Sequence, residues 1–438
     1  MIPKRVFYGW LVVLTAAAAM VGTLPGRSQG LGLITEPLLS DFADAGLDRV
    51  RYAGINFWAT LAGALGALGV GRMIDRAGAR VVLVVVSLLL AVTVALMSQV
   101  TSIVALAITL AATRAIGQGA LSVISIAMVG HWFKRRINAA MATYSIALSI
   151  GFMLAFPLVG SAVQAFGWRR AWLWVAIALG AGLAPLALVV VRRGPETIGL
   201  LPDGDTTTAG VASATLSDNQ ASGYRVSEAL ATGAFWVFGV GAALYGLVAS
   251  GIGLFNESIL AERGFSHDVY YQSLVVTAMT GLAGNFLGGW MTSRRGAADA
   301  ADQARRSAGG LANKGRLSLT RLMAAALFVL AAGVAALPHL SSLTHVMTWA
   351  AAMGLGGGVM MVLFFSAWPQ VFGRRHLGQI QGIAQALTVL ASAIGPLLLA
   401  WCVSATGSYA AMFRILAVAI ALTGAASMIV VVPKAAES

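Results

Sequence analysis

About twelve runs of roughly 20 apolar residues follow one another along the whole chain, and they restrict its fold more than any other feature. A helix of that length crosses a hydrocarbon core about 30 Å thick, and in lipid its backbone polar groups must be paired internally. Only 10% of the 438 residues are charged, whereas soluble domains carry about 25%. The sequence therefore predicts an all-α membrane protein without a sizeable soluble domain.

The runs define twelve expected membrane spans, and the basic residues set their orientation. The spans are 7–38, 52–73, 80–99, 104–130, 138–165, 171–191, 232–260, 271–291, 320–338, 345–369, 377–403 and 409–432. About 21 of the 29 Lys and Arg residues fall on the side of the N-terminus, which the positive-inside rule makes cytoplasmic. We therefore expect both termini in the cytoplasm and a multi-pass protein of the plasma membrane, with the bacterial inner membrane favoured. The net charge of +13 follows from this topology and does not indicate nucleic acid.

The chain divides into two halves of six spans each. Residues 1–191 are expected to form an N-terminal bundle and residues 231–438 a C-terminal bundle, joined by a polar cytoplasmic linker at 192–230. GLGLITEPLL at 30–39 corresponds to GIGLFNESIL at 251–260, and later segments of the halves repeat such matches in the same order. Duplicated bundles of this kind place the substrate at the repeat interface near the bilayer midplane and work by rocking of one half against the other.

Short motifs along the chain resemble those of the major facilitator superfamily. GRMIDRAGAR at 71–80 is similar to the superfamily's loop between the second and third helices, and RAIGQG at 114–119 is similar to its fourth-helix arginine motif. Within the superfamily the chain resembles the monocarboxylate transporter and oxalate:formate antiporter branch. That resemblance is carried by Arg27 followed by Ser28, WFKRR at 132–136 and PETIGLLPDG at 195–204. It implies a secondary active transporter that works by alternating access, with a monomer as the expected state.

The motif at 71–80 implies a gate on the cytoplasmic side. Its gating residues are Gly71, Asp75, Arg76, Gly78 and Arg80. The resemblance implies that Asp75 accepts hydrogen bonds from the N-terminus of a neighbouring helix, while Arg76 and Arg80 face the cytoplasm. The second copy has Ser293 in place of the acid, so we expect asymmetric gating. Ordinary positive-inside loop charge is the alternative interpretation.

Arg27 is a fixed positive charge inside the first span and is the first functional candidate. An arginine in the hydrocarbon core costs about 2.5–3.5 kcal/mol, so it normally faces a water-filled cavity or a partner. No acidic residue lies in the middle of any span, and a guanidinium holds a carboxylate by two parallel hydrogen bonds. We therefore expect a small organic anion, a mono- or dicarboxylate, as substrate. Outward snorkelling of Arg27 is the alternative.

Polar side chains of other spans are expected to complete the substrate site. The full set is Arg27, Gln29, Tyr144, Tyr245, Asn256, Thr280, Asn285 and Gln385. Each neutral member also has a simpler interpretation, because polar side chains commonly join helices to one another in membranes.

Three ionisable residues are candidates for energy coupling. Arg114 lies in the fourth span, where the resemblance implies a structural or proton-relay role, and no acid accompanies it in that span. Glu36 and Glu257 occupy matching positions near the outer ends of the first and seventh spans. A partly buried carboxyl there binds a proton or pairs with an arginine of the outer surface. The eighth span offers Thr280 and Asn285 rather than a charged residue, so proton symport and anion exchange both stay open.

Functions other than anion transport are less well supported by the sequence. It contains no Walker loop, zinc-ligand cluster or nucleophile elbow, so we expect no enzyme activity, cofactor or metal. Proton-coupled efflux of an amphipathic drug or metabolite is the main alternative, although AFPLVG at 155–160 matches the glycine–proline motif of drug–proton antiporters only in part. A non-transporting membrane sensor is a remote alternative. The expected partners are the small anion, protons in the case of symport, and the lipid bilayer.

Overall fold

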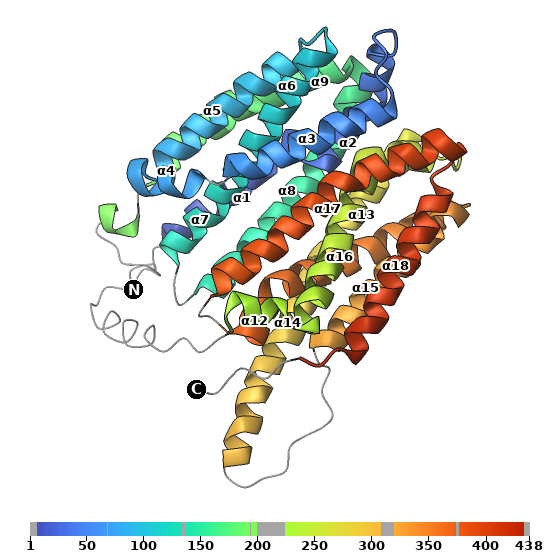
Figure 1. The fold of residues 1–438 in the computed structure, drawn as a ribbon. Helices are drawn as coiled ribbons and strands as arrows, with labels where there is room; N and C mark the ends of the chain where they lie inside the picture. Colours follow the sequence, from blue (N-terminus) through green and yellow to red (C-terminus); the bar gives the residue numbers. More distant parts are fainter. Residues whose placement is uncertain are drawn as a thin grey trace. The chain divides into compact units, whose positions relative to one another are not determined.

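The computed structural model describes residues 7–67, 69–133, 136–192, 194–198, 224–307, 319–373 and 376–432. These residues are mainly helical, as the apolar runs predict (Figure 1). Eleven helices among them are long and apolar enough to cross a membrane. The remaining predicted span, 52–73, is occupied by α3 (Arg49–Ala67) and α4 (Val70–Ala77). The helices therefore fit the predicted architecture of twelve spans.

The first half of the chain supplies the six spans drawn from blue to green in Figure 1. Besides α3 and α4, its elements are α1 (Gly9–Val21), η1 (Leu24–Gly26), α2 (Ser28–Asp41), α5 (Ala79–Met97), α6 (Ile103–Thr113), η2 (Arg114–Leu121), α7 (Ser122–Trp132), α8 (Ile137–Phe166), α9 (Trp168–Ile177), η3 (Ala178–Leu183), α10 (Ala184–Val190) and η4 (Pro195–Ile198). α1 packs against α7 and α8, and α5 packs against α9 and α10. Trp132 and Trp172 are fully buried among these helices.

The first span is not the continuous helix that the sequence predicts for 7–38. α1 ends at Val21, a 3₁₀ turn covers η1, and α2 begins only at Ser28. Pro25 lies inside this turn, where its missing N–H does not interrupt a helical hydrogen-bond ladder. Arg27 follows the turn in an extended conformation, with φ −94° and ψ 150°. The side chain of Arg27 therefore projects from non-helical backbone between two helical segments.

The fourth span is also irregular, because η2 is a stretch of π-helix that begins at Arg114. π-Helical turns are rare and occur frequently at functional sites. The two irregular segments touch: a Cβ atom on Gly26 of η1 would lie 2.7 Å from the carbonyl oxygen of Thr113 and 2.9 Å from the backbone nitrogen of Gln118. Arg27 and Arg114 therefore both emerge where non-α backbone of the first and fourth spans meets.

The second half of the chain supplies the remaining spans. Its elements are α12 (Val226–Leu230), α13 (Gly233–Ala261), α14 (His267–Ser307), α15 (Leu319–Ala336), η7 (Leu337–His339), α16 (Leu343–Phe372), α17 (Leu377–Thr406) and α18 (Ala410–Ile429). α15 packs against both α16 and α18. α14 continues to Ser307, well beyond the predicted end of its span at 291. Trp368 and Phe372 of α16 are fully buried and stack with ring centroids 6.0 Å apart.

The helices form two compact units. The first unit comprises Met1–Ala212, Ser250–Val275 and Ala393–Ala405, and the second comprises Ser213–Ala249, Val276–Ser392 and Thr406–Ser438. One end each of α13, α14 and α17 therefore packs with the first six spans. The predicted bundles at 1–191 and 231–438 stay a prediction, and most of the predicted linker at 192–230 lies outside the described residues.

Candidate functional site

Arg27 is partly buried in the first unit, and it contacts neutral groups there. Its Nε donates a hydrogen bond of 2.6 Å to Oγ1 of Thr23, and one terminal nitrogen lies 2.9 Å from the sulfur of Met20. The guanidinium carbon lies 5.4 Å from the ring centroid of Phe152 on α8, a cation–π distance. Within the part of the chain that the structure describes, no acidic side chain pairs with Arg27. Its positive charge is therefore not neutralised by these residues.

Tyr144 of α8 lies near Arg27 and interacts with it electrostatically. Its hydroxyl is 2.9 Å from Oγ of Ser125, which donates a hydrogen bond of 2.6 Å to the carbonyl oxygen of Ala16. Because the Ser125 proton is used in that bond, the Tyr144 hydroxyl is the donor to Ser125. The chain of bonds joins α8, α7 and α1 beside Arg27. These hydrogen bonds between helices fix the position of the Tyr144 side chain.

Two further predicted site residues lie on the same unit. Gln29 of α2 lies against Gly253 of α13, where an added Cβ atom would lie 3.3 Å from the Gln29 side chain. Asn256 lies on α13, one helical turn further along, and is 4% exposed. Its Oδ1 is buried and has no hydrogen-bond partner among the described residues. An unpaired buried carbonyl is costly, so Asn256 has an unused acceptor to offer a donor group.

Three other predicted site residues, Tyr245, Thr280 and Asn285, lie together on the second unit around a glycine-rich turn of α16, Gly354–Gly358. A Cβ atom on Gly357 would lie 2.8 Å from the Tyr245 hydroxyl. A Cβ atom on Gly354 would overlap Oγ1 of Thr280. A Cβ atom on Gly358 would lie 2.7 Å from the backbone nitrogen of Asn285. Small residues allow such close helix packing. Gln385 of α17 is exposed and lies on the same unit. The sequence analysis missed the role of this glycine-rich turn.

Arg114 is 1% exposed and is held by neutral side chains of three spans. Its terminal nitrogens donate to Oε1 of Gln118 at 2.9 Å, to Oδ1 of Asn56 at 2.9 Å and to Oγ of Ser28 at 3.3 Å. Its Nε is buried and has no partner among the described residues. Ser28 in turn lies 3.0 Å from Oγ of Ser250 on α13. These hydrogen bonds connect Arg114 to the first, second and seventh spans, and its structural or proton-relay role stays a prediction.

Glu36 of α2 forms a two-pronged ion pair with Arg49 at the start of α3. The two terminal nitrogens of Arg49 lie 2.5 Å and 2.7 Å from the two carboxylate oxygens. Both side chains are about 30% exposed, so solvent weakens the attraction between them. The Arg49 guanidinium also lies 6.0 Å from the ring centroid of Phe255 on α13. The sequence analysis expects an arginine partner for Glu36 as one of two alternatives, and Arg49 is that partner.

Glu257 of α13 pairs with a histidine rather than with an arginine. Its Oε1 lies 2.5 Å from Nδ1 of His267, the first residue of α14. The carboxyl is 7% exposed, and its Oε2 is buried without a partner among the described residues. The sequence analysis missed His267. A signal was present in the sequence, because this histidine follows the candidate acid Glu257 by ten residues, near the end of a predicted span.

The predicted gating motif lies on α4 and at the start of α5. Gly78 connects these helices with φ +81°, a conformation that favours glycine. Arg76 is exposed and Arg80 is partly buried. Gly71 and Asp75 are helical, but their side-chain surroundings lie outside the described residues, so the predicted hydrogen bonds of Asp75 stay a prediction.

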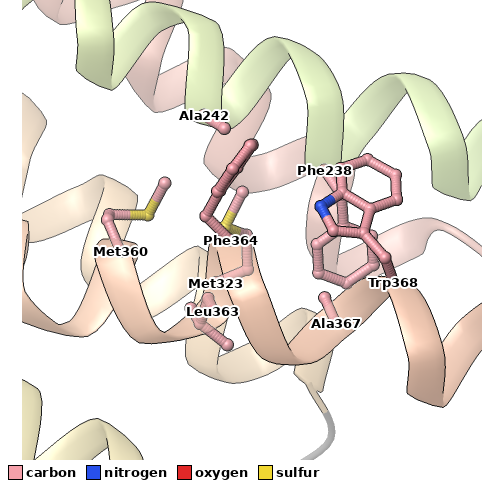
Figure 2. A pocket seen from close by; sticks show the side chains of 8 residues that line it. All are labelled: Phe238, Ala242, Met323, Met360, Leu363, Phe364, Ala367 and Trp368. Atoms are coloured by element: carbon pink, nitrogen blue, oxygen red, sulfur yellow. The ribbon is translucent and has the colours of Figure 1, made fainter. Parts of the chain in front are cut away.

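A small apolar pocket, with room for about one water molecule, lies within the second unit (Figure 2). It is lined by Phe238, Ala242, Met323, Met360, Leu363, Phe364, Ala367 and Trp368. Figure 2 shows the indole nitrogen of Trp368 on the side of its ring that faces Phe364. This nitrogen is buried and has no hydrogen-bond partner among the described residues. The unpaired N–H is costly to bury, and methionines allow the lining of the pocket to change shape.

Comparison with known families identifies the type of protein. A family model described as the Major Facilitator Superfamily matches residues 6–302. The chain belongs to this superfamily. The helices and the match together make it a multi-pass membrane transporter, as the motifs at 71–80 and 114–119 indicate. A comparison with curated protein sequences gave no match.

Solved structures of the superfamily share the transporter's fold. One is a bacterial homolog of the human lysosomal transporter Spinster, in an inward-facing and unoccupied conformation. It is 16% identical, with a TM-score of 0.68, and the match covers 97% of this chain and 96% of the other. The same type of protein in an inward-facing and occupied conformation gives 13% identity and a TM-score of 0.64, over 95% and 96% of the two chains. The twelve-helix major facilitator fold is thereby confirmed.

Proposed function

We propose that this transporter carries a small organic anion, a mono- or dicarboxylate, and binds it at Arg27. The proposal is carried by one observation: the partly buried Arg27 guanidinium contacts Thr23, Met20 and Phe152 but no acid of the described chain. A carboxylate supplies the missing negative charge and accepts two parallel hydrogen bonds from a guanidinium.

The backbone around Arg27 supports the same ligand. α2 begins at Ser28, directly after Arg27, so the positive end of its helix dipole lies beside the arginine. Helix N-termini bind carboxylates and other anions through free N–H groups. Tyr144 and Asn256 lie on the same unit, but the Tyr144 proton is used in its bond to Ser125 and the unpaired buried oxygen of Asn256 is an acceptor, so these two observations add no donor for the carboxylate. Tyr245, Thr280, Asn285 and Gln385 stay predicted members of the substrate site.

The proposal includes the setting in which transport takes place. The two six-helix bundles at 1–191 and 231–438 alternate access to the site, and the motif from Gly71 to Arg80 gates the cytoplasmic side. Both termini lie in the cytoplasm, and the transporter works as a monomer in a bacterial inner membrane. Its place within the superfamily is the monocarboxylate transporter and oxalate:formate antiporter branch, for which Arg27 with Ser28 is the supporting feature.

Uptake of radiolabelled carboxylates into proteoliposomes tests the proposal. Charge-assisted hydrogen bonds contribute about 1.5–3 kcal/mol, so Arg27→Gln should weaken carboxylate binding by about 10- to 100-fold. Arg27→Lys keeps the charge but not the paired donors and should lose less. Small carboxylates should also raise the melting temperature of the wild type, and not that of Arg27→Gln. Unchanged uptake by a well-folded Arg27→Gln variant would disprove the proposal.

Efflux of an amphipathic drug or metabolite is the second candidate, and the pocket beside Trp368 is the observation that favours it. A ligand acceptor would pair the buried indole N–H, and the flexible side chains of Met323 and Met360 would have to move to admit the ligand. Trp368→Phe removes that donor and keeps an aromatic ring. If amphipathic compounds raise the melting temperature of the wild type and not of Trp368→Phe, while carboxylates have no effect, efflux becomes the better assignment.

A further inference from the structure

Positions related by the internal repeat meet each other in the first unit. Gly32 and Gly253 are equivalent in the repeat, and their backbones touch, because a Cβ atom on Gly32 would overlap the Gly253 carbonyl oxygen. Four residues further along each helix stand Glu36 and Glu257, which are also equivalent and interact electrostatically. The contact between α2 and α13 therefore brings two carboxyl groups together. The end of the first unit that carries Glu36, Arg49, Glu257 and His267 is called the Glu36 end below.

The charges of Glu36, Arg49, Glu257 and His267 balance only when one proton is bound. Arg49 pairs with both oxygens of Glu36, and one arginine offsets one carboxylate. Glu257 is left with His267, which is charged only when protonated. A buried carboxylate oxygen without a donor, such as Oε2 of Glu257, is costly in its charged state.

We propose that the Glu257–His267 pair binds one proton when α13 closes against α2, and releases it when the Glu36 end opens. In the closed form the proton neutralises a carboxyl that is buried next to Glu36. In the open form water solvates Glu257, so its carboxylate is stable without the proton. Closure and proton binding therefore favour each other, so lower pH stabilises the closed form.

The other groups around Glu257 do not replace this proton. α2 presents Glu36, α3 presents Arg49, and α14 presents His267 with the hydroxyls of Tyr270 and Tyr271. Asp268, further along the same turn of α14, is exposed. α8 packs against Tyr271 at Gly160, and neither α8 nor the segment Ala393–Ala405 of α17 carries a charged side chain. His267, whose side chain is 61% exposed, gives the pair a path for proton exchange with solvent.

The proton site adds a mode of energy coupling to the proposed function. It rests on that function only for the identity of the transported anion. If an anion sits at Arg27 when the Glu36 end closes, proton and anion are enclosed together, which is proton symport rather than anion exchange. The proton site itself requires no assumption about the cargo, and it is tested without any.

A distance measurement across the Glu36 end tests the proton site in substrate-free protein. Spin labels are placed on the exposed positions Asp44→Cys and Ala405→Cys in a Cys402→Ala background. Distance distributions are recorded by electron paramagnetic resonance from about pH 5 to about pH 8, the range in which histidine titrates. The wild type should shift toward the shorter distance as the pH falls.

Three variants separate the proton site from general effects of pH. Glu257→Gln imitates the protonated carboxyl and should show the short distance at every pH. His267→Gln removes the second group of the pair at an exposed position and should lose most of the pH-dependent shift. Glu262→Gln removes a nearby acid that pairs with Arg263 and should behave as the wild type. A pH-dependent shift that persists in both Glu257→Gln and His267→Gln, or that is missing from the wild type, overturns the proposal.

Transport measurements distinguish this proposal from the assignment of the cargo. Glu257→Gln should lose accumulation driven by a pH gradient but keep counterflow of a carboxylate between equal pH on both sides. Arg27→Gln should lose both kinds of transport and keep the pH-dependent distance change. If Arg27→Gln transports normally while the distance change follows Glu257, the anion assignment fails and the proton site stands. If Glu257→Gln still accumulates substrate along a pH gradient, the coupling role fails and the anion assignment stands.

Discussion

Gly32 of α2 and Gly253 of α13 touch through their backbones, so that a Cβ atom on Gly32 would overlap the carbonyl oxygen of Gly253. Oγ of Ser28 and Oγ of Ser250 lie 3.0 Å apart one turn earlier on the two helices. The first and seventh spans are therefore in direct contact from Ser28 to Glu36. Everything proposed for the Glu36 end depends on this contact.

Gly32→Ala should separate α2 from α13. The added methyl group meets backbone, which cannot rotate away, and overpacking of this kind costs about 1–3 kcal/mol. The melting temperature in detergent should fall, and the spin-label distance across the Glu36 end should lengthen. Gly54→Ala is the matched control, because no atom lies within 4 Å of its added Cβ atom. The control should leave the distance unchanged and stabilise α3 by up to about 1 kcal/mol.

Arg114→Lys should destabilise the protein although it keeps the positive charge. The guanidinium reaches Gln118, Asn56 and Ser28 at once, and an ammonium group cannot reproduce that planar arrangement of donors. Loss of one or two hydrogen bonds to a buried charged group should cost about 2–4 kcal/mol. Thermal unfolding in detergent measures the loss. A melting temperature equal to that of the wild type would contradict the structural role of the network.

Tyr144→Phe should cost about 1 kcal/mol, since it removes the hydrogen bond to Ser125 and leaves the bond from Ser125 to Ala16 intact. Tyr245→Phe serves as the comparison, because no hydrogen bond from its hydroxyl is found among the described residues. Chemical or thermal unfolding of both variants should show the larger loss for Tyr144→Phe. Equal losses would mean that the Ser125 bond adds nothing to stability.

A double-mutant cycle on Glu36→Gln and Arg49→Gln should give a coupling energy of about 0.5–1 kcal/mol. The pair has ideal two-pronged geometry, but its side chains are about 30% exposed and solvent screens the attraction. Arg49→Gln alone should also increase the pH dependence of the distance across the Glu36 end, because two carboxyl groups then lack an arginine. A pH profile identical to that of the wild type would contradict a shared electrostatic cluster.

The sequence predicted the spans well because lipid leaves little choice of secondary structure. The expected span 320–338 corresponds to α15 (Leu319–Ala336), and 409–432 corresponds to α18 (Ala410–Ile429). The break at Leu24–Arg27 was not predicted, although Pro25 signals it, because membrane helices often accommodate proline without ending. The π-helical stretch from Arg114, which packs against η1, was also missed, because the apolar pattern of a span does not distinguish π-helix from α-helix.

The candidate site was predicted in part. Hydropathy alone singles out Arg27 and Arg114, since a charge inside an apolar run is conspicuous. The partners of these residues come from distant spans, as with Asn56 and Arg114, and sequence periodicity does not show which helix faces which. The pairing of Glu257 with His267 crosses the turn between α13 and α14, and its geometry depends on where each helix ends. Helix ends are the least reliable part of any sequence-based prediction.

Gly26, in the 3₁₀ turn of the first span, packs closely against Thr113 and Gln118 at the π-helical stretch of the fourth span. Arg27 and Arg114 lie next to this contact, and no hydrogen bond joins the two side chains among the described residues. We therefore expect a change in the winding of one helix to shift the backbone that carries both guanidinium groups.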